Sequence, residues 1–300
     1  MLVKFWGVRG SIPSPGPNTM RYGGNTTCYE VINSKGEQII LDAGTGIREL
    51  SEFMMKNKKK MDSALCISHT HWDHIHGLPF FVPLYIPGNK LSIYGPVHYE
   101  RKLEDILISQ MDHAVFPIRL DETQATREVF ELQAESFTFK SFNVSTRYMN
   151  HPVMVLAYRI ECEGKVLVYS GDNEPFYDPI SIGKSEDELS EDDIERREIA
   201  EEQNEDIVQF FRGADLLICD AQYTPEEYYD GKVGWGHRHF ESAIDLAQKA
   251  EVKRLALTHH EPTRMDNEMD VYMERAHKYA KEVKASFELT AAIEGKEISL

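Results

Sequence analysis

The sequence predicts an α/β fold in which two mixed β-sheets lie face to face and helices cover them from outside. Two observations lead to this prediction. Strand-sized apolar segments occur in both halves of the 300-residue chain, and in each half they are followed by helical segments. Hydrophobic residues make up 41% of the chain and charged residues 28%, which are ordinary values for a globular protein with a large core.

The first half opens with strands joined by turns. Strands are expected at 3–6, 28–32 and 38–42, and Asn33-Ser34-Lys35-Gly36 fits a hairpin turn between the second and the third. A helix at about 47–60 precedes a strand at 64–67, which leads directly into a histidine-rich segment. The expected elements after it are a strand at 91–94, a helix near 99–110, and a meander of strands over about 128–160 and 165–169.

The second half alternates helices with buried strands. An acidic segment after Ser170-Gly171-Asp172 is expected to form a solvated helix through about residue 211. Strands are expected at 216–219 and 254–257, and helices at about 240–250 and 267–281. Because no repeat, linker or clear boundary interrupts this pattern, we expect one domain over 1–300 with an acidic helical insertion at about 184–210.

The charge of the chain is strongly negative, at −17 from 33 Lys and Arg against 50 Asp and Glu. Residues 186–206 carry twelve acidic and two basic side chains, a local net charge of −10 that leaves −7 for the rest of the chain. This segment is expected to be a solvated face, with an acidic docking surface as the alternative. The overall charge argues against a long nucleic acid as partner, because nucleic-acid affinity comes from Lys and Arg.

The sequence also indicates where in the cell the protein is expected. No apolar run approaches the roughly 20 residues that a membrane helix needs, so no membrane partner is expected. The first residues, MLVKFWGVRGSIPS, contain neither an apolar signal core nor a cleavage site, and the cytoplasm is therefore the expected location. The four cysteines, Cys28, Cys66, Cys162 and Cys219, lie in apolar stretches without a CxxC pair, which favours reduced core thiols over a disulfide framework.

The segment His69-Thr70-His71-Trp72-Asp73-His74 carries the strongest chemical signal. With 12 His in 300 residues, the pattern HxHxDH is expected by chance on the order of once in a thousand such chains. Imidazole nitrogens and a carboxylate at the end of a buried strand suit Zn²⁺ and similar divalent ions. Three His and one Asp do not easily serve one tetrahedral ion, so two metal ions are the natural expectation.

This motif resembles the signature of the metallo-β-lactamase fold, and three further positions match the family's order of ligands. They are His151 in Asn150-His151-Pro152, Asp172 in Ser170-Gly171-Asp172, and His259 in Leu257-Thr258-His259-His260. The resemblance implies a four-layer αββα sandwich. It also implies a first metal at His69, His71 and His151, a second at Asp73, His74 and His259, and Asp172 spanning both. His260 competes with His259 for the last position.

The resemblance also implies a chemistry. Two divalent ions, with zinc the leading candidate and manganese or iron as alternatives, would generate a hydroxide that attacks a phosphoryl group, and Asp73 could accept a proton from that nucleophile. The β-lactamases proper place a cysteine where Asp172 stands, which argues against β-lactam hydrolysis.

A second motif narrows the resemblance to the phosphodiesterase and tRNase Z-like branch. Gly234-Trp235-Gly236-His237-Arg238-His239-Phe240 looks like the glycine-histidine motif of that branch. Its histidine, here His237, would stabilise charge or protonate the leaving oxygen, and Asp220 would orient it. The departure from the family pattern is Arg238-His239 after the histidine, which keeps His239 as a lesser candidate.

Other segments are similar to bacterial cyclic-nucleotide-phosphodiesterase-like hydrolases. These are residues 5–13, 22–26, 41–46 and 77–81. Within them, Arg9 or Asn25 could reach a phosphate, although tight turns explain the segments equally well. Asp42 is expected to orient a metal-binding histidine rather than to bind metal itself. His76, His98, His113 and His277 are not expected to be ligands.

The leading functional hypothesis is a dinuclear phosphodiesterase acting on a small diester, with a 3′,5′-cyclic nucleotide as first candidate. The alternative within the fold is a tRNA 3′-processing endoribonuclease. That enzyme inserts its substrate-gripping arm between the third histidine and the bridging aspartate, and here His151 and Asp172 are only 21 positions apart. A thioester or lactone hydrolase ranks third, and a non-enzymatic metal-bound scaffold fourth. A homodimer is common in the resembling group, but no residue in this sequence argues for it.

Overall fold

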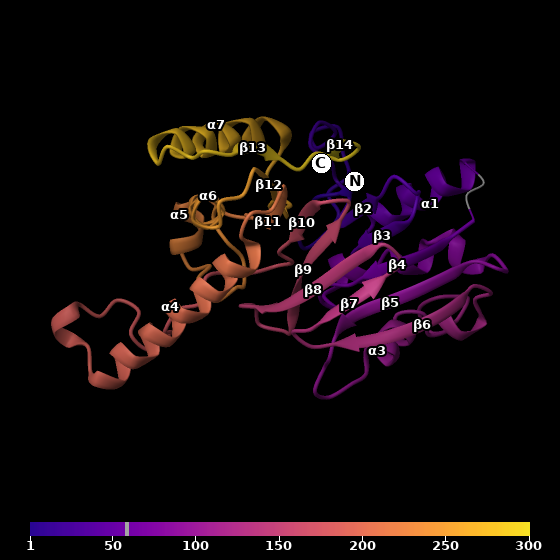
Figure 1. Cartoon of the computed structure of the whole chain (residues 1–300), viewed down its shortest axis with the longest axis horizontal. Helices are drawn as coiled ribbons and strands as arrows, with labels where there is room; N and C mark the ends of the chain where they lie inside the picture. The colour runs from indigo at the N-terminus through magenta and orange to yellow at the C-terminus, as the bar shows by residue number, and fades with distance from the viewer. Residues whose placement is uncertain (58–59) are drawn as a thin grey trace.

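The computed structural model describes residues 1–57 and 60–300. It confirms the predicted fold class, with two seven-stranded mixed β-sheets and helices on their outer faces (Figure 1). The strand order is β14-β1-β2-β3-β4-β5-β6 in the first sheet and β13-β12-β11-β10-β9-β8-β7 in the second. Each sheet is antiparallel on one side and parallel on the other, and strands β3 to β6 and β10 to β13 form the parallel parts.

The first sheet contains β1 (Leu2–Gly7), β2 (Cys28–Ile32), β3 (Gln38–Leu41), β4 (Asp62–Cys66), β5 (Lys90–Pro96), β6 (Thr126–Leu132) and β14 (Glu297–Ser299). The second contains β7 (Ser136–Phe139), β8 (Phe142–Met149), β9 (Val155–Cys162), β10 (Lys165–Tyr169), β11 (Leu216–Asp220), β12 (Arg254–Thr258) and β13 (Glu288–Ala291). The α-helices are α1 (Gly46–Lys56), α2 (Trp72–Ile75), α3 (Leu103–Ser109), α4 (Glu191–Phe211), α5 (Pro225–Tyr229), α6 (Phe240–Lys249) and α7 (Asp266–Glu282).

Three apolar clusters hold the four layers together. The cluster between the sheets includes Phe5 and Tyr158, one from each sheet and both without exposed surface. The apolar side of α1, with Ile47 and Leu50, packs in a cluster on the outer face of the first sheet. Phe240 of α6 belongs to the corresponding cluster outside the second sheet. Apolar faces meeting in this order produce the helix–sheet–sheet–helix stack.

One part of the sequence prediction was wrong. The expected meander places β6 with the strands that follow it, but β6 pairs in parallel with β5 at the edge of the first sheet, and β7 begins the second sheet. Most side chains of β6 are at least partly exposed, so its apolar pattern does not show which sheet it joins. Three short elements, α5, β13 and β14, were not predicted, because they are only three to five residues long.

The helices follow the predictions with small shifts at their ends. The helix expected at 47–60 ends at Lys56, and positions 58 and 59 of that prediction lie outside the described residues. The acidic helix α4 starts behind Ser190, whose hydroxyl accepts from the Asp193 amide, and it projects away from the body of the molecule (Figure 1). Among the described residues, no helix is long and apolar enough to cross a membrane.

Candidate metal centre and catalytic groups

The candidate site lies where strands of the two sheets end. Asp42 follows β3, the HxHxDH segment follows β4, and Asp172 follows β10. Asp220 ends β11 and His259 follows β12. Because parallel strands end at the same edge of a sheet, residues far apart in sequence meet there. Asp42 and His259 both adopt a left-handed backbone, with φ of 59° and 60°, which turns the chain sharply after each strand.

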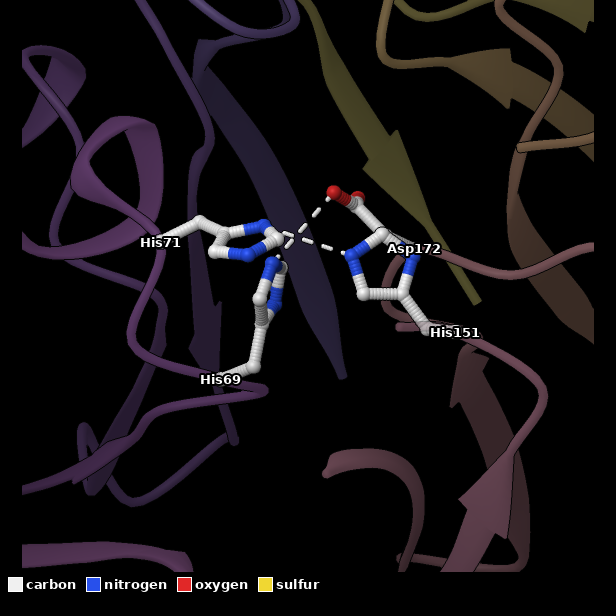
Figure 2. A group of neighbouring side chains, drawn as sticks. All are labelled: His69, His71, His151 and Asp172. Carbon is white, nitrogen blue, oxygen red and sulfur yellow. Dashed lines mark hydrogen bonds and ion pairs between the residues drawn. The ribbon is translucent and has the colours of Figure 1, made fainter. Parts of the chain in front are cut away.

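The first group contains His69, His71, His151 and Asp172, the four residues drawn in Figure 2. One ligand atom from each lies within 4.8 Å of the others. His151 Nε2 is 3.3 Å from His71 Nδ1, and His69 Nε2 is 3.5 Å from Asp172 Oδ2. Burial lowers the pKa of His151 to about 4, so its imidazole is neutral near pH 7, as a metal ligand must be.

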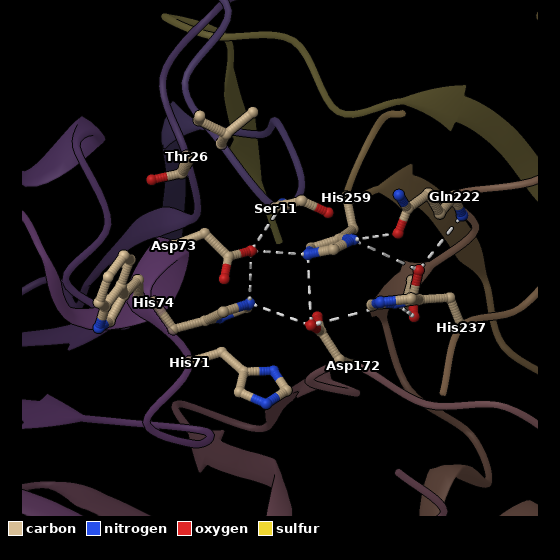
Figure 3. A network of polar contacts seen from close by, with 12 residues as sticks. Ser11, Thr26, His71, Asp73, His74, Asp172, Gln222, His237 and His259 are labelled. Atoms are coloured by element: carbon tan, nitrogen blue, oxygen red, sulfur yellow. Dashed lines mark hydrogen bonds and ion pairs between the residues drawn. The ribbon is translucent and has the colours of Figure 1, made fainter. Parts of the chain in front are cut away.

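The second group contains Asp73, His74, Asp172 and His259 (Figure 3). His259 Nε2 lies 3.0 Å from Asp73 Oδ2, and His74 Nε2 lies 3.1 Å from Asp172 Oδ2. Burial opposes protonation of His259, but Asp172 and Asp73 outweigh it and raise its pKa to about 9. The buried carboxylates favour a positive charge on the imidazoles beside them. A bound divalent cation can supply that positive charge in place of the protons.

The donor set fits two divalent ions. His69 Nε2 is buried and has no hydrogen-bond partner, which is costly unless a ligand uses its lone pair. Both groups combine imidazole nitrogens with carboxylate oxygens, the ligands that Zn²⁺ and similar ions prefer. Asp172 belongs to both groups, so the residues expected for each metal, and the shared carboxylate between them, come together in space.

Other side chains orient the histidines. Asp42 Oδ2 accepts a 2.8 Å hydrogen bond from His74 Nδ1, which leaves Nε2 of His74 facing Asp172, as the sequence analysis expected of Asp42. Ser68 and Tyr169 also donate to Asp42. Oε1 of Gln222 lies 3.1 Å from His259 Nδ1. This residue was not predicted, because glutamine carries no metal-ligand pattern in the sequence. Such partners fix the ring orientation that a metal ligand needs.

Replacing Asp42 with asparagine is expected to lower metal affinity about 10- to 100-fold, the usual effect of losing a carboxylate that holds a ligating histidine. Asparagine tolerates the left-handed backbone at this position, so the fold should survive. Competition with a chromogenic chelator measures the affinity. Unchanged affinity in the folded variant would contradict the orienting role of Asp42.

His237 and Asp220 form a pair beside the second group. His237 Nδ1 lies 2.9 Å from Asp220 Oδ2, so its Nε2 is free for a substrate. The His237 ring stacks on that of His259 with centroids 4.7 Å apart. The amide of Asn173 also donates to Asp220, and Arg238 donates to the Asn173 side chain at 2.5 Å. Arg238, which departs from the family pattern, thus braces the loop that carries Asp172.

The loop before His237 also contacts the first ligand group. The carbonyl of Gly236 accepts a 2.8 Å hydrogen bond from His151 Nδ1. Gly236 has φ of +84°, and a Cβ there would lie 2.1 Å from that nitrogen, so only glycine fits. A cavity of about 470 Å³ opens above both groups and is lined by Ser11, Thr70, His71, Trp72, Asp73, Asp172, His237 and His259.

Several alternatives from the sequence have other roles. His260 points away from the cluster and donates to the Ala292 carbonyl at 2.8 Å, so the geometry favours His259 as the last ligand. His239 caps α6 by accepting from the Ser242 amide. For Arg9 and Asn25, the contacts favour the tight-turn interpretation over binding of a phosphate. Buried Arg9 donates to the carbonyls of Gly23, Glu261 and Arg264, and Asn25 donates to Glu294. His76, His98, His113 and His277 belong to none of the described groups.

Comparison with known proteins points to the same fold. Residues 37–185 match the family profile described as Beta-lactamase superfamily domain. Ribonuclease Z of Clostridium tetani is 26% identical, over 89% of this chain and 90% of its own. Ribonuclease Z of Clostridium perfringens is 27% identical, over 77% and 82%. These relatives favour the RNA-processing alternative of the sequence analysis over its leading hypothesis.

Solved structures resemble the chain along nearly its whole length. The metallo-β-lactamase fold protein YhfI from Bacillus subtilis superposes with a TM-score of 0.67 at 22% identity, covering 99% of each chain. The short form of human tRNase Z superposes with a TM-score of 0.61 at 20% identity, covering 100% of this chain and 99% of that one. Yeast PDE1 superposes with a TM-score of 0.65 at 15% identity, covering 100% and 99%. At these identities the likeness concerns the fold.

Proposed function

We propose that this chain is a metal-dependent hydrolase that cleaves a small phosphodiester at a dinuclear site, which agrees with the match of residues 37–185 to the Beta-lactamase superfamily domain. The single observation that carries this proposal is the joint position of the two ligand groups and the His237–Asp220 pair around one cavity. A 3′,5′-cyclic nucleotide is the first candidate substrate.

His69, His71 and His151 would hold one divalent ion, Asp73, His74 and His259 the other, and Asp172 both. When bound, such ions polarise a phosphoryl oxygen and lower the pKa of bound water. His237 protonates the leaving oxygen through Nε2, while Asp220 holds the imidazolium through Nδ1. Asp73 takes a proton from the attacking water. Its Oδ2 is already engaged by the Ser11 amide at 2.8 Å and by His259, so we assign the proton to Oδ1.

A ribonuclease Z-type activity is the second candidate, and the curated relatives favour it. Two features of this chain argue for a small substrate instead. Between His151 and Asp172, the chain forms only β9, β10 and their short connections, and these strands belong to the second sheet, which leaves no segment to grip tRNA. The projecting helix α4 lies after Asp172 and is acidic, so it would repel an RNA backbone.

The deciding experiment measures metal content together with turnover of two classes of substrate. We expect about two metal ions per chain, and faster cleavage of 3′,5′-cyclic AMP or bis-p-nitrophenyl phosphate than of a precursor tRNA with a 3′ trailer. Cleavage of the precursor tRNA at its 3′ end, with little on small diesters, would establish the second candidate. Two bound metals with no diester cleavage would favour a thioester or lactone hydrolase, and no metal would refute the proposal.

The remaining expectations follow from this function. A small phosphodiester is the proposed partner, with no nucleic acid or membrane required. All four cysteines are buried free thiols, which agrees with the cytoplasmic location that we propose.

A further inference from the structure

Trp72 stands at the wall of the candidate cavity with its indole in solvent. Its neighbours in sequence, His71 and Asp73, both belong to the ligand groups, yet the residue is 81% exposed. The other two tryptophans are 8% exposed, for Trp6, and 55% exposed, for Trp235. Trp72 lines the same cavity as Asp172 and His237. Burial of an aromatic side chain of this size normally stabilises the folded protein. Its exposure beside the candidate site is therefore best explained by contact with a ligand.

The backbone of Trp72 is held by hydrogen bonds, while its indole ring is exposed to solvent. Trp72 begins α2, and its carbonyl accepts from the His76 amide at 2.7 Å. The flanking residues are tied into the polar network of Figure 3, where Asp73 holds the Ser11 amide and His259. Among residues 1–57 and 60–300, no aromatic ring stacks on Trp72 and no cation lies over it. A flat apolar surface on a rigid support is what stacking of a planar ring requires.

The rest of the cavity wall shows what such a ring would add. Its lining contains hydroxyl, imidazole and carboxylate groups but neither Lys nor Arg. Contact with the phosphate would therefore fall to His237 and to metal ions held by the two ligand groups, and the part of the substrate remote from phosphorus needs another contact. A cavity of about 470 Å³ is in the size range of small-ligand sites, large enough for a nucleotide.

We propose that Trp72 is a specificity-determining residue that stacks on the base of a nucleoside phosphodiester. This inference rests on the proposed function and narrows its substrate class from small diesters to those that carry a nucleobase. Stacking on any base is possible because every base offers a π-face, so Trp72 selects nucleotides as a class rather than one base.

Two diesters with the same leaving group isolate the effect of the base. Thymidine 5′-p-nitrophenyl phosphate carries a base, and methyl p-nitrophenyl phosphate does not. We expect Trp72→Ala to lower kcat/KM for the thymidine ester about 5- to 150-fold, the range that one base–aromatic stack supplies, and for the methyl ester less than about threefold. The loss should fall mainly on KM, and Trp72→Phe should restore most of it. Tyr99→Ala removes an aromatic residue that is 90% exposed and outside the cavity lining, and should change neither rate.

Equal losses on both esters with metal content preserved would overturn the inference. A direct binding measurement separates its failure from that of the proposed function. Thymidine 5′-monophosphate should quench the tryptophan fluorescence of the wild-type protein and leave that of Trp72→Phe unchanged. If the wild type cleaves neither ester, the proposed function is wrong, and the same titration still decides whether a nucleotide stacks on Trp72. Absence of quenching in the wild type would overturn the inference.

Discussion

Replacing Asp172 with alanine is expected to remove bound metal and hydrolytic turnover together. Asp172 is 2% exposed and belongs to both ligand groups, so its loss would remove the one carboxylate that the two proposed ions would share. Two divalent ions held close together would then repel each other with no negative charge between them. We expect metal content to fall from about two ions per chain to less than one. Turnover should fall by about three powers of ten or more, since a catalytic metal supplies several kcal/mol.

A buried aspartate outside the site provides the matched control. Asp215 is 7% exposed and pairs with Lys253 at 2.8 Å near the start of β11, far along the strand from the residues that carry the site. Asp215→Ala should lower stability but keep metal and kcat. Metal analysis by mass spectrometry and a turnover assay compare the two variants. Full metal content in Asp172→Ala would show that Asp172 does not bridge the ions.

Replacing His237 with alanine is expected to keep both metals and to lower turnover by roughly two to four powers of ten, the usual range for a lost general acid or base. His237 contacts Asp220 and stacks on His259. It belongs to a third group of possible ligands, with Asp172, Asp220 and His259, but the first two groups each hold four possible ligands without it. Because the proposed role is protonation of the leaving oxygen, the loss should be larger for 3′,5′-cyclic AMP, which releases an alkoxide, than for bis-p-nitrophenyl phosphate.

The neighbouring histidine tests whether this effect is specific. His239 lies two residues away and caps α6, so His239→Ala should reduce stability by about 1 kcal/mol and leave the rate with both substrates near the wild-type value. Wild-type turnover of both substrates by His237→Ala would refute its catalytic role. An equal loss on both substrates would argue for a role in charge stabilisation instead of leaving-group protonation.

The strands and the order of the polar motifs could be predicted from the sequence because they depend on local patterns. The buried strands β11 and β12 are short apolar runs that end in the polar residues Asp220 and Thr258, and HxHxDH places four candidate ligands within six residues. Edge strand β6 could not be placed in this way. Its sheet is decided by pairing with β5, a contact between residues that lie 36 positions apart in the sequence.

The sequence by itself determined that His and Asp residues follow the predicted strands in the order of the ligands of a metal-binding family. It also determined that the net charge of the chain is strongly negative. Only the tertiary structure decided which of two adjacent histidines enters the site. The left-handed backbone of His259 turns its ring toward Asp73, and the next residue, His260, faces the Ala292 carbonyl. The same holds for Arg9, which satisfies three loop carbonyls instead of a phosphate. The direction of a side chain after a strand depends on the turn that follows and on neighbouring residues from other strands. A single segment of sequence does not show these contacts.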